Sequence, residues 1–286
     1  MNEQKIVVVT DSAAYIPQTA LGDLNIPVIP LWLIWDNERF RDGVDIDPTT
    51  FYRRLRDSKS DPTSSQPSVR EFVDFFRQVA AEEKADAIVG VFVSSKMSGT
   101  VASAQAAQAQ LPELNIRIVD SLGFSMSLGF VARAAARAAA AGQSLDEVIT
   151  AAEDMRERIR FIFVVDTLEY LHRGGRIGGA KRIFGTALKI KPLLHMKDGQ
   201  IEPLVQVRTK RKAIARMWEI TTEWLGEKQM VEATVIDVDC PDEGDAVAKQ
   251  TQERFGVSTI YRTTVSPVIG AHAGPGGVGL IFYTDH

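Results

Sequence analysis

The sequence predicts an α/β protein with two domains, and three features of the chain support this prediction. Short apolar, β-branched runs at residues 5–10 (KIVVVT) and 87–93 (AIVGVFV) are typical of strands buried on both faces of a parallel sheet. In the first half of the chain such runs alternate with helical patterns, as they do in βαβ units. Further along, two short apolar runs flank residues 197–199 (KDG), which predicts an antiparallel hairpin.

The change from alternation to a hairpin indicates where the two domains should meet. The chain has 286 residues, and at roughly 150 residues per domain this length allows one or two domains. We expect an N-terminal α/β domain with a parallel sheet over residues 1–155. We expect a C-terminal α+β domain over residues 156–286.

The first domain should open with the strand at 5–10, which ends at Thr10-Asp11-Ser12, where a loop begins. The helix that starts after residue 144 carries a capping signal, with Ser144 as N-cap and Glu147 as its capping-box partner. The other elements expected here are strands at 26–35 (broken by two prolines), 87–93 and 116–119, helices at 49–56, 69–81 and 125–141, a helix ending near 107, and a polar loop at 62–68.

The second domain should contain the hairpin over residues 193–207 and a glycine-rich turn at 174–179 (GGRIGG). A helix at 180–187 is expected to follow that turn. The remaining elements expected here are strands at 161–165, 232–237, near 257–261 and near 278–283, and helices at 210–225 and 242–255.

Composition and charge exclude several classes of protein. The chain is 45% hydrophobic and 24% charged, which is ordinary for a globular protein and rules out disorder or a coiled coil. With a net charge of -4, the chain lacks the excess of basic residues typical of a nucleic-acid-binding protein. The single cysteine, Cys240, allows no intrachain disulfide. No apolar run approaches the ~20 residues that span a bilayer, and no signal-peptide layout opens the chain. We expect a cytoplasmic protein without nucleic-acid partners or membrane insertion.

Several common catalytic and cofactor motifs are missing from the sequence. The four histidines form no H-x-x-x-H pair and there is no C-x-x-C, so we expect no zinc site. Residues 274–279 (GPGGVG) match G-x-G-x-x-G, but they precede a strand and leave no room for a βαβ unit. A tight turn with positive φ is the better interpretation of these glycines. We therefore expect neither a metal nor a cofactor.

What remains is a set of polar side chains placed where strands end. Ser98, Gly99 and Thr100 lie between the strand at 87–93 and a helix whose N-terminus favours an anion. In open parallel sheets, ligands bind at the carboxyl ends of the strands. Ser64 lies in a similar loop, and His272 lies in a glycine-rich segment where backbone can approach a ligand closely. Together these residues predict a small oxyanion site built from neutral donors.

Each of these residues also has a purely structural interpretation. Ser98 can serve only as a helix cap, Ser64 only as a turn hydroxyl, and a single histidine is more often structural than ligand-binding. Arg176 can be a surface charge, and Asp11 is better suited to holding a loop by hydrogen bonds than to catalysis. The residues alone therefore indicate an α/β protein with an anion pocket and leave its ligand open.

Several segments, taken in chain order, resemble the motifs of one protein family. The segments are 9–12 (VTDS), 64–68 (SSQPS), 94–100 (SSKMSGT), 120–129 (DSLGFSMSLG), 168–177 (LEYLHRGGRI), 189–194 (KIKPLL), 207–209 (VRT) and 270–279 (GAHAGPGGVG). In this order they resemble the DegV family of bacterial fatty-acid-binding proteins, which includes the FakB subunits of fatty acid kinase. Each motif alone is weak, but the ordered set is specific and runs from about residue 6 to residue 283.

The resemblance implies a two-domain fold with a long-chain fatty acid between the domains. It implies that the carboxylate is held by Ser64, Ser98 and His272, with Arg176 near this head-group network. It further implies that a separate ATP-dependent kinase subunit converts the bound carboxylate into an acyl phosphate, and that Arg208 acts with that subunit. The chain itself would then present substrate and would not bind ATP.

Two departures from the family pattern bear on this site. Ser64 stands where threonine is usual, which keeps the hydroxyl but removes a methyl group, and Met97 replaces the usual leucine in the pocket wall. The neighbouring Ser65, Gly99 and Thr100 are expected to support the carboxylate site.

The physical chemistry of a fatty acid fits this expectation. A carboxylate beside apolar surface needs hydrogen-bond donors to remain charged. The tail gains about 0.8 kcal/mol per buried methylene, so a deep apolar slot should supply most of the affinity. The candidates for lining such a slot, each of which can equally be core, are Phe124, Met126, Phe130, Phe161, Phe163, Leu188, Ile190 and Leu194.

Two other classes of function remain open at this point. Ser98 and His272 can instead form the nucleophile and base of an acyl hydrolase, or of a phosphotransferase, in the same pocket. A nucleic-acid binder is the weakest alternative because of the negative net charge. It depends on the basic side chains of the second domain, which are also suited to steering an acidic protein partner: Arg173, Arg176, Lys181, Arg182, Lys189, Lys191, Arg208, Lys210, Arg211 and Lys212.

Overall fold

The computed structural model describes residues 4–185 and 190–285, and the strands in these ranges form three sheets. The first is a parallel sheet with the strand order β2-β1-β6-β7. Its strands are β1 (Ile6–Asp11), β2 (Val28–Ile29), β6 (Ala87–Phe92) and β7 (Ile116–Asp120). Every residue of β1 and β6 is buried, as a sheet covered on both faces requires. The predicted parallel α/β architecture of the first half is confirmed.

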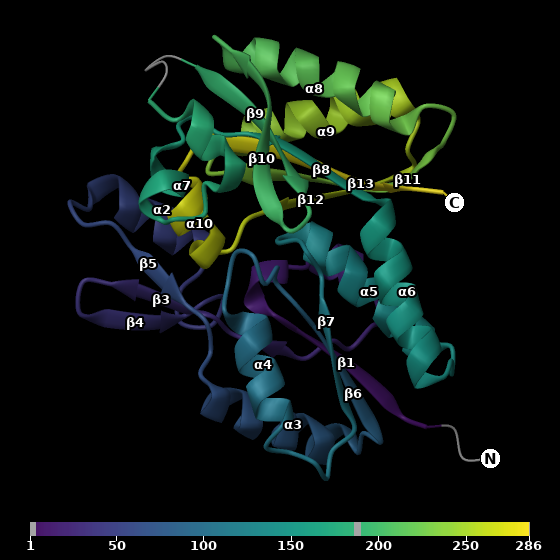
Figure 1. Cartoon of the computed structure of the whole chain (residues 1–286). Coiled ribbons are helices and arrows are strands. Elements are labelled where there is room, and N and C mark those ends of the chain that lie inside the picture. The colour runs from purple at the N-terminus through teal and green to yellow at the C-terminus, as the bar shows by residue number, and fades with distance from the viewer. Residues whose placement is uncertain (1–3, 186–189, 286) are drawn as a thin grey trace.

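Helices cover both faces of this parallel sheet (Figure 1). On one face, α3 (Val69–Glu83) and α4 (Thr100–Gln108) pack their apolar sides against β1 and β6. On the other face lies the alanine-rich α5 (Met126–Ala140), whose small side chains let α6 (Leu145–Arg158) pack closely against it. The capping box predicted for Ser144 and Glu147 is present at the start of α6.

A small antiparallel sheet with the order β4-β3-β5 extends from the first domain. Its strands are β3 (Trp32–Trp35), β4 (Glu38–Arg41) and β5 (Thr63–Ser65), and α2 (Pro48–Asp57) lies between β4 and β5 in the chain. The prediction of one broken strand at 26–35 followed by a loop at 62–68 was therefore incomplete. Backbone pairing of β5 with β3 places Ser64 opposite Leu33. The residues of such a short polar strand have no local pattern that predicts it.

The second domain is built on a mixed sheet with the order β10-β9-β8-β13-β11-β12. The β11–β12 pair is parallel and the other pairs are antiparallel. The strands are β8 (Ile159–Val164), β9 (Lys191–Lys197), β10 (Gln200–Val207), β11 (Met230–Val238), β12 (Thr259–Thr264) and β13 (Gly277–Thr284). The predicted hairpin is the β9–β10 pair, and the α+β character of this half is confirmed.

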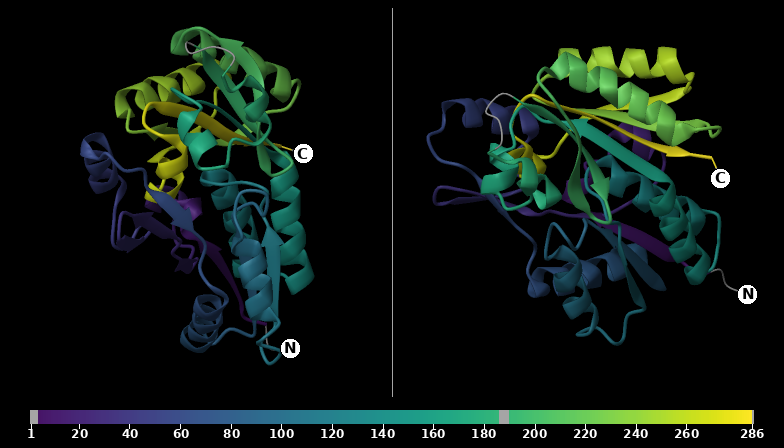
Figure 2. Two further views of the ribbon diagram at one scale, coloured as in Figure 1. Left: turned by 60° about the vertical axis from the view of Figure 1, so that its left-hand side comes forward. Right: turned by 45° about the horizontal axis from the view of Figure 1, so that its top comes forward.

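The two faces of this sheet belong to different cores. Ile162 and Val164 of β8 face α8 (Lys210–Leu225) and α9 (Pro241–Phe255), which lie together over one face (Figures 1 and 2). Phe161 and Phe163 point the other way, into the apolar core shared with the first domain. Because successive side chains of a strand point to opposite faces, β8 contributes to both cores. The two halves of the molecule are thus joined by packed side chains and not only by a linker.

Short elements complete the chain and carry much of the site. They are η1 (Ser12–Ala14), α1 (Gln18–Leu21), α7 (Glu169–Arg173), η2 (Gly178–Ile183) and α10 (Pro267–Ala273). The helix predicted at 180–187 is replaced by the 3-10 turn η2, and positions 186 and 187 of that prediction lie outside the described residues. The helices α7 and α10 were not predicted from the sequence.

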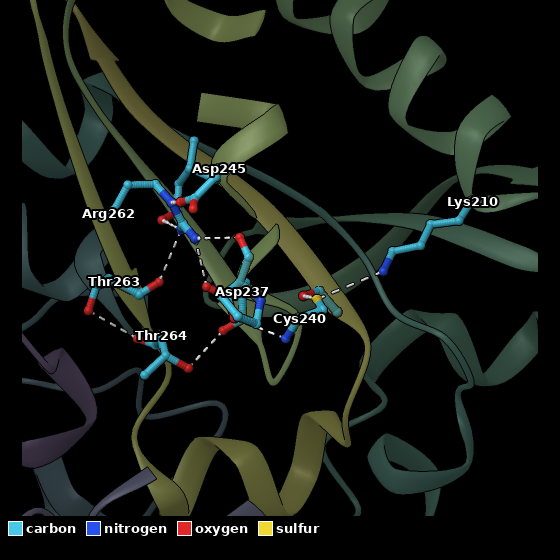
Figure 3. Close-up of polar contacts among 10 residues, drawn as sticks. Lys210, Asp237, Cys240, Asp245, Arg262, Thr263 and Thr264 are labelled. Atoms are coloured by element: carbon cyan, nitrogen blue, oxygen red, sulfur yellow. Dashed lines mark hydrogen bonds and ion pairs between the residues drawn. The ribbon is translucent and has the colours of Figure 1, made fainter. Parts of the chain in front are cut away.

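A polar cluster holds the segment that leads into α10 (Figure 3). Arg262 on β12 donates to Asp237 Oδ2 on β11 at 2.9 Å and to Asp245 Oδ1 on α9 at 2.9 Å. Thr264, at the end of β12, donates to the carbonyl oxygen of Asp237 at 2.9 Å. Because β12 is fixed to β11 and α9, the start of α10 three residues beyond it is fixed as well.

The domain boundary near residue 155 is our proposal. It lies in the last turn of α6, which packs on α5 of the first domain and runs directly into β8 of the second sheet.

Within residues 4–185 and 190–285, no helix is long and apolar enough to cross a bilayer.

Candidate functional site

An apolar pocket lies between the two domains. Its walls include Val93 and Phe124 from the first domain and Phe161, Phe163 and Val238 from the second. The cavity between these walls has a volume of about 60 Å³, well below the ~300–1,000 Å³ typical of ligand pockets. A long apolar ligand would therefore have to push these side chains apart.

Five of the predicted site residues line this pocket, and they come from four separate segments of the sequence. Ser64 comes from β5, Ser98 from the loop after β6, Arg176 from the turn after α7, and His272 from α10. Ser65 also lines the pocket. The structure thus gathers polar groups from both domains in one apolar space.

A second pocket, with a volume of about 170 Å³, lies beside this polar group. It shares Ser64, Arg176 and His272 with the apolar pocket and is otherwise lined by residues such as Asp61 and Arg173. Arg173 and Asp61 form an ion pair of 2.6 Å and are both exposed. The polar side chains therefore stand between the apolar pocket and a charged surface depression.

Ser64 and His272 are joined directly. Ser64 Oγ lies 2.7 Å from His272 Nε2, across 208 residues of sequence. His272 is buried (9% exposed), and its Nδ1 has no hydrogen-bond partner among the described residues. A buried N–H without an acceptor is rarer and costlier than a buried lone pair without a donor. This favours the tautomer in which Nε2–H donates to Ser64 and leaves the serine O–H free to donate to a ligand.

The charge state of His272 follows from the same surroundings. Burial lowers its pKa, and the positive charge of Arg176 lowers it further, to about 4. At neutral pH the imidazole is therefore an uncharged donor. This matches the expectation of an oxyanion site built from neutral groups.

A pH titration of the ligand-free protein should reveal this directly. We expect the His272 ring resonances, followed by NMR, to keep their neutral shifts down to a midpoint near pH 4. Since the folded pKa lies below the unfolded value of about 6.5, this group costs the folded state about 3 kcal/mol progressively as the pH falls from 6.5 to 4. A His272→Gln variant assigns the resonance, and a midpoint at or above 6 would contradict the description of the site.

Arg176 links the segment after α7 to the loop after β6. Its Nε donates to the carbonyl oxygen of Met97 at 3.0 Å, and its Nη1 donates to that of Gly174 at 2.7 Å. The first bond crosses from the second domain to the first. Arg176 is thus a structural bridge as well as a positive charge beside His272, and its interpretation as a mere surface charge is wrong.

The loop before α4 is organised around Ser98. Its Oγ lies 2.8 Å from Thr100 Oγ1 and accepts from the backbone N–H of Thr100 at 3.3 Å, while the N-cap position itself is Gly99. A Cβ at Gly99 would lie only 2.9 Å from Nε2 of Gln66, so the Gln66 amide lies close against this loop. The segments at 64–68 and 94–100, which appear as separate motifs in the sequence, are therefore packed together.

The segment at 9–12 supports the site from behind. Asp11 is fully buried and accepts from the backbone N–H groups of Ala13 and Val93 at 2.9 and 2.7 Å, as expected of a residue that holds loops. Ser12 donates to Asp42 at 2.7 Å, and Asp42 accepts from Val268 in the first turn of α10 at 3.1 Å. This chain of contacts holds the helix that carries His272. Sequence reasoning missed Asp42, which lies in no motif of the predicted site.

Burial also perturbs these two carboxyls. It raises the pKa of Asp11 to about 7 and that of Asp42 to about 6, because the charged forms lose water. The folded state therefore holds these protons more tightly than the unfolded chain, and the stability they contribute falls as the pH rises from about 4 to 7.

Not every predicted residue lies at the pocket. Arg208 is exposed between β10 and α8 and does not line it. Phe124, Phe161 and Phe163 line the pocket as predicted. The other slot candidates do not: Met126, Phe130 and Leu194 are buried core, Ile190 is half-buried outside the walls, and Leu188 lies outside the described residues.

Comparison with known proteins decides the family. The family model described as "Uncharacterised protein, DegV family" matches residues 5–285. The chain belongs to the DegV family. A DegV domain-containing protein of Streptomyces coelicolor is 39% identical over 277 residues, covering 96% of this chain and 97% of that protein.

Solved structures of the DegV family share the whole fold. A DegV family protein from Thermus thermophilus, whose structure is described as showing fatty acid binding, superposes with a TM-score of 0.91 at 32% identity, covering 99% of this chain and 100% of that one. DegV of Bacillus subtilis, described as a fatty acid binding protein, superposes with a TM-score of 0.90 at 32% identity and the same coverage. The predicted two-domain DegV fold is confirmed.

Proposed function

We propose that this chain binds a long-chain fatty acid in the apolar pocket, with the carboxylate at Ser64, Ser98 and His272 and with Arg176 beside them. The observation that carries the proposal is the gathering of these polar groups at an otherwise apolar pocket. The fatty acid binding described for DegV family proteins of the same fold supports it.

The energetics of the pocket suit this ligand. A carboxylate leaving water needs donors, and the Ser64 hydroxyl, backed by His272 Nε2, supplies one at the pocket. The tail gains about 0.8 kcal/mol per methylene, so a long chain contributes on the order of 10 kcal/mol before ordering costs. The tail should therefore set the affinity, while the polar groups set the orientation.

The position of the polar group also suits transfer of the ligand to a partner. Ser64, Arg176 and His272 line the surface depression as well as the apolar pocket, so a carboxylate held there is close to the outside. In this proposal a separate ATP-dependent kinase subunit reaches the carboxylate through that depression and forms an acyl phosphate. Exposed Arg208 is the proposed contact for the partner.

One observation favours a second candidate, an acyl hydrolase. The 2.7 Å contact between Ser64 and His272 is within the range of a nucleophile and its base. The serine paired with His272 is thus Ser64, whereas the sequence pairing named Ser98. No described group orients Nδ1, which a base accepting the serine proton would need as a donor. Labelling of Ser64 by a fluorophosphonate, or turnover of a nitrophenyl acyl ester, would support the hydrolase; neither is expected.

Mass spectrometry of organic extracts tests the main proposal. Recombinant protein should carry fatty acids of long chain length, and delipidated protein should bind added palmitate or oleate. An empty extract together with no binding of either acid would refute the proposal.

Variants at the polar end should separate head-group contacts from tail contacts. Ser98→Ala and His272→Ala should each weaken oleate binding about 10- to 100-fold, since a hydrogen bond to a charged group contributes about 1.5–3 kcal/mol. Ser95→Ala, an exposed serine of the same loop, is the matched control and should bind like the wild type. Equal affinity of all three variants would show that these groups do not hold the carboxylate.

A further inference from the structure

The end of the apolar pocket away from the polar residues is closed by aromatic rings. Phe161 lies 4.9 Å from Phe124 and 5.0 Å from Phe163, measured between ring centroids. A Cβ at Gly279 on β13 would lie 2.9 Å from Phe163 Cβ and 3.1 Å from a ring carbon of Phe161, so this glycine lets both side chains lie close to the sheet. The cluster is buried and tightly packed, with Phe161 at 2% exposure.

The direction of the pocket follows from strand β8. Phe161, Phe163 and Val165 are alternate residues, and all three line the pocket. At about 3.3 Å per residue, Phe161 and Val165 lie roughly 13 Å apart. The Val165 end leads through α7 to Arg176 and the polar group, whereas the Phe161 end adjoins α6 (Figure 1).

A separate surface groove lies beyond the Phe161 end. It is lined by the segment after β7, the end of α6, the start of β8, the end of β9 with the turn that follows it, and Trp224 of α8. Among the described residues, Phe161 is the one that lines both this groove and the apolar pocket. Phe161 is therefore the residue at which the two spaces adjoin.

From this arrangement we propose that Phe161 sets the upper limit of acyl chain length by closing the pocket against the β9–β10 groove. This inference rests on the proposed function. With the ring removed, the ω-end of a longer chain passes into the groove, where Met196 and Trp224 offer apolar contact. A chain longer than the closed pocket must otherwise bend or leave its carboxylate away from Ser64 and His272.

The test is a chain-length profile of binding to delipidated protein. Affinities for hexadecanoate, octadecanoate, eicosanoate and docosanoate are measured for the wild type, Phe161→Leu and Phe161→Ala. We expect affinity for docosanoate to rise about tenfold relative to hexadecanoate in the alanine variant, and by less in the leucine variant, because each further buried methylene adds affinity. Phe161→Leu is the milder change and keeps the test open if the alanine variant does not fold.

Phe282→Ala is the matched control. Phe282 is a fully buried ring of β13 that packs in the other core, toward α8 and α9, so its loss should leave the length profile unchanged. A Phe161→Leu protein that binds hexadecanoate normally and keeps the wild-type profile would overturn the inference while leaving the proposed function intact. Wild-type protein that binds none of the four acids would instead refute the proposed function, and the inference with it.

Discussion

A Gly174→Ala variant should fold normally and bind oleate about 10- to 100-fold more weakly than the wild type. Gly174 has φ -73° and ψ -8°, which alanine adopts without strain. The added Cβ would, however, lie well inside van der Waals contact with His272 Nδ1. The imidazole must therefore move, and its bond to Ser64 is lost with the head-group contact that depends on it. Titration of delipidated protein with oleate measures the effect.

Gly175→Ala is the control for this change. At Gly175 a Cβ meets no atom within 4 Å, but φ is +71°, so alanine strains the backbone by about 1 kcal/mol without touching His272. The two variants should therefore show opposite profiles, with binding lost in Gly174→Ala and stability lowered in Gly175→Ala. Wild-type binding by Gly174→Ala would mean that His272 does not hold the ligand.

An Arg133→Ala variant should lose about 3 kcal/mol of unfolding free energy, the largest stability loss that we expect for a charged residue. Arg133 on α5 is 2% exposed and pairs with Glu232 on β11 at 2.8 Å, which joins the two domains. Its guanidinium also donates to the Tyr261 hydroxyl at 3.2 Å. Truncation leaves a cavity and a poorly compensated carboxylate at 13% exposure. Urea denaturation gives the free energy, and the melting temperature should fall by about 10 °C.

Arg137 provides the comparison, because it contacts the same carboxylate from a different environment. It lies 3.3 Å from Glu232 and is half exposed. Arg137→Ala should cost under about 1 kcal/mol, as exposed ion pairs do. If the two alanine variants had the same free energy of unfolding, burial of Arg133 would not explain the contribution of the inter-domain ion pair to stability.

The elements that were predicted best from the sequence are those whose structure is determined by residues close together in the chain. The continuous apolar runs of β1 and β6 could be read as doubly covered parallel strands, and Ser144 with Glu147 as a capping box. The glycines of residues 274–279 were predicted to form a tight turn with positive φ; Gly274 and Gly276 have φ of +67° and +85°, whereas Gly277 and Gly279 are part of strand β13. Local chemistry determines each of these features.

The features that were missed depend on distant partners. His272 was placed in a glycine-rich segment with no helix predicted, yet it lies on α10, a helix of seven residues. The cap Ser266 and Pro267 are a weak helix signal when Gly270 and Gly274 follow so closely. Ser64 lies in a strand only because β3 pairs with it. Contacts between segments hundreds of residues apart, such as Asp42 with Val268, leave no periodicity in either segment.

A crystal structure of the protein grown with oleate tests the proposed binding mode most directly. We expect one elongated ligand whose carboxylate lies within hydrogen-bond distance of Ser64 and Ser98 and whose tail follows β8 toward Phe161. A pocket without ligand at saturating oleate, or a ligand with its carboxylate at the Phe161 end, would contradict it.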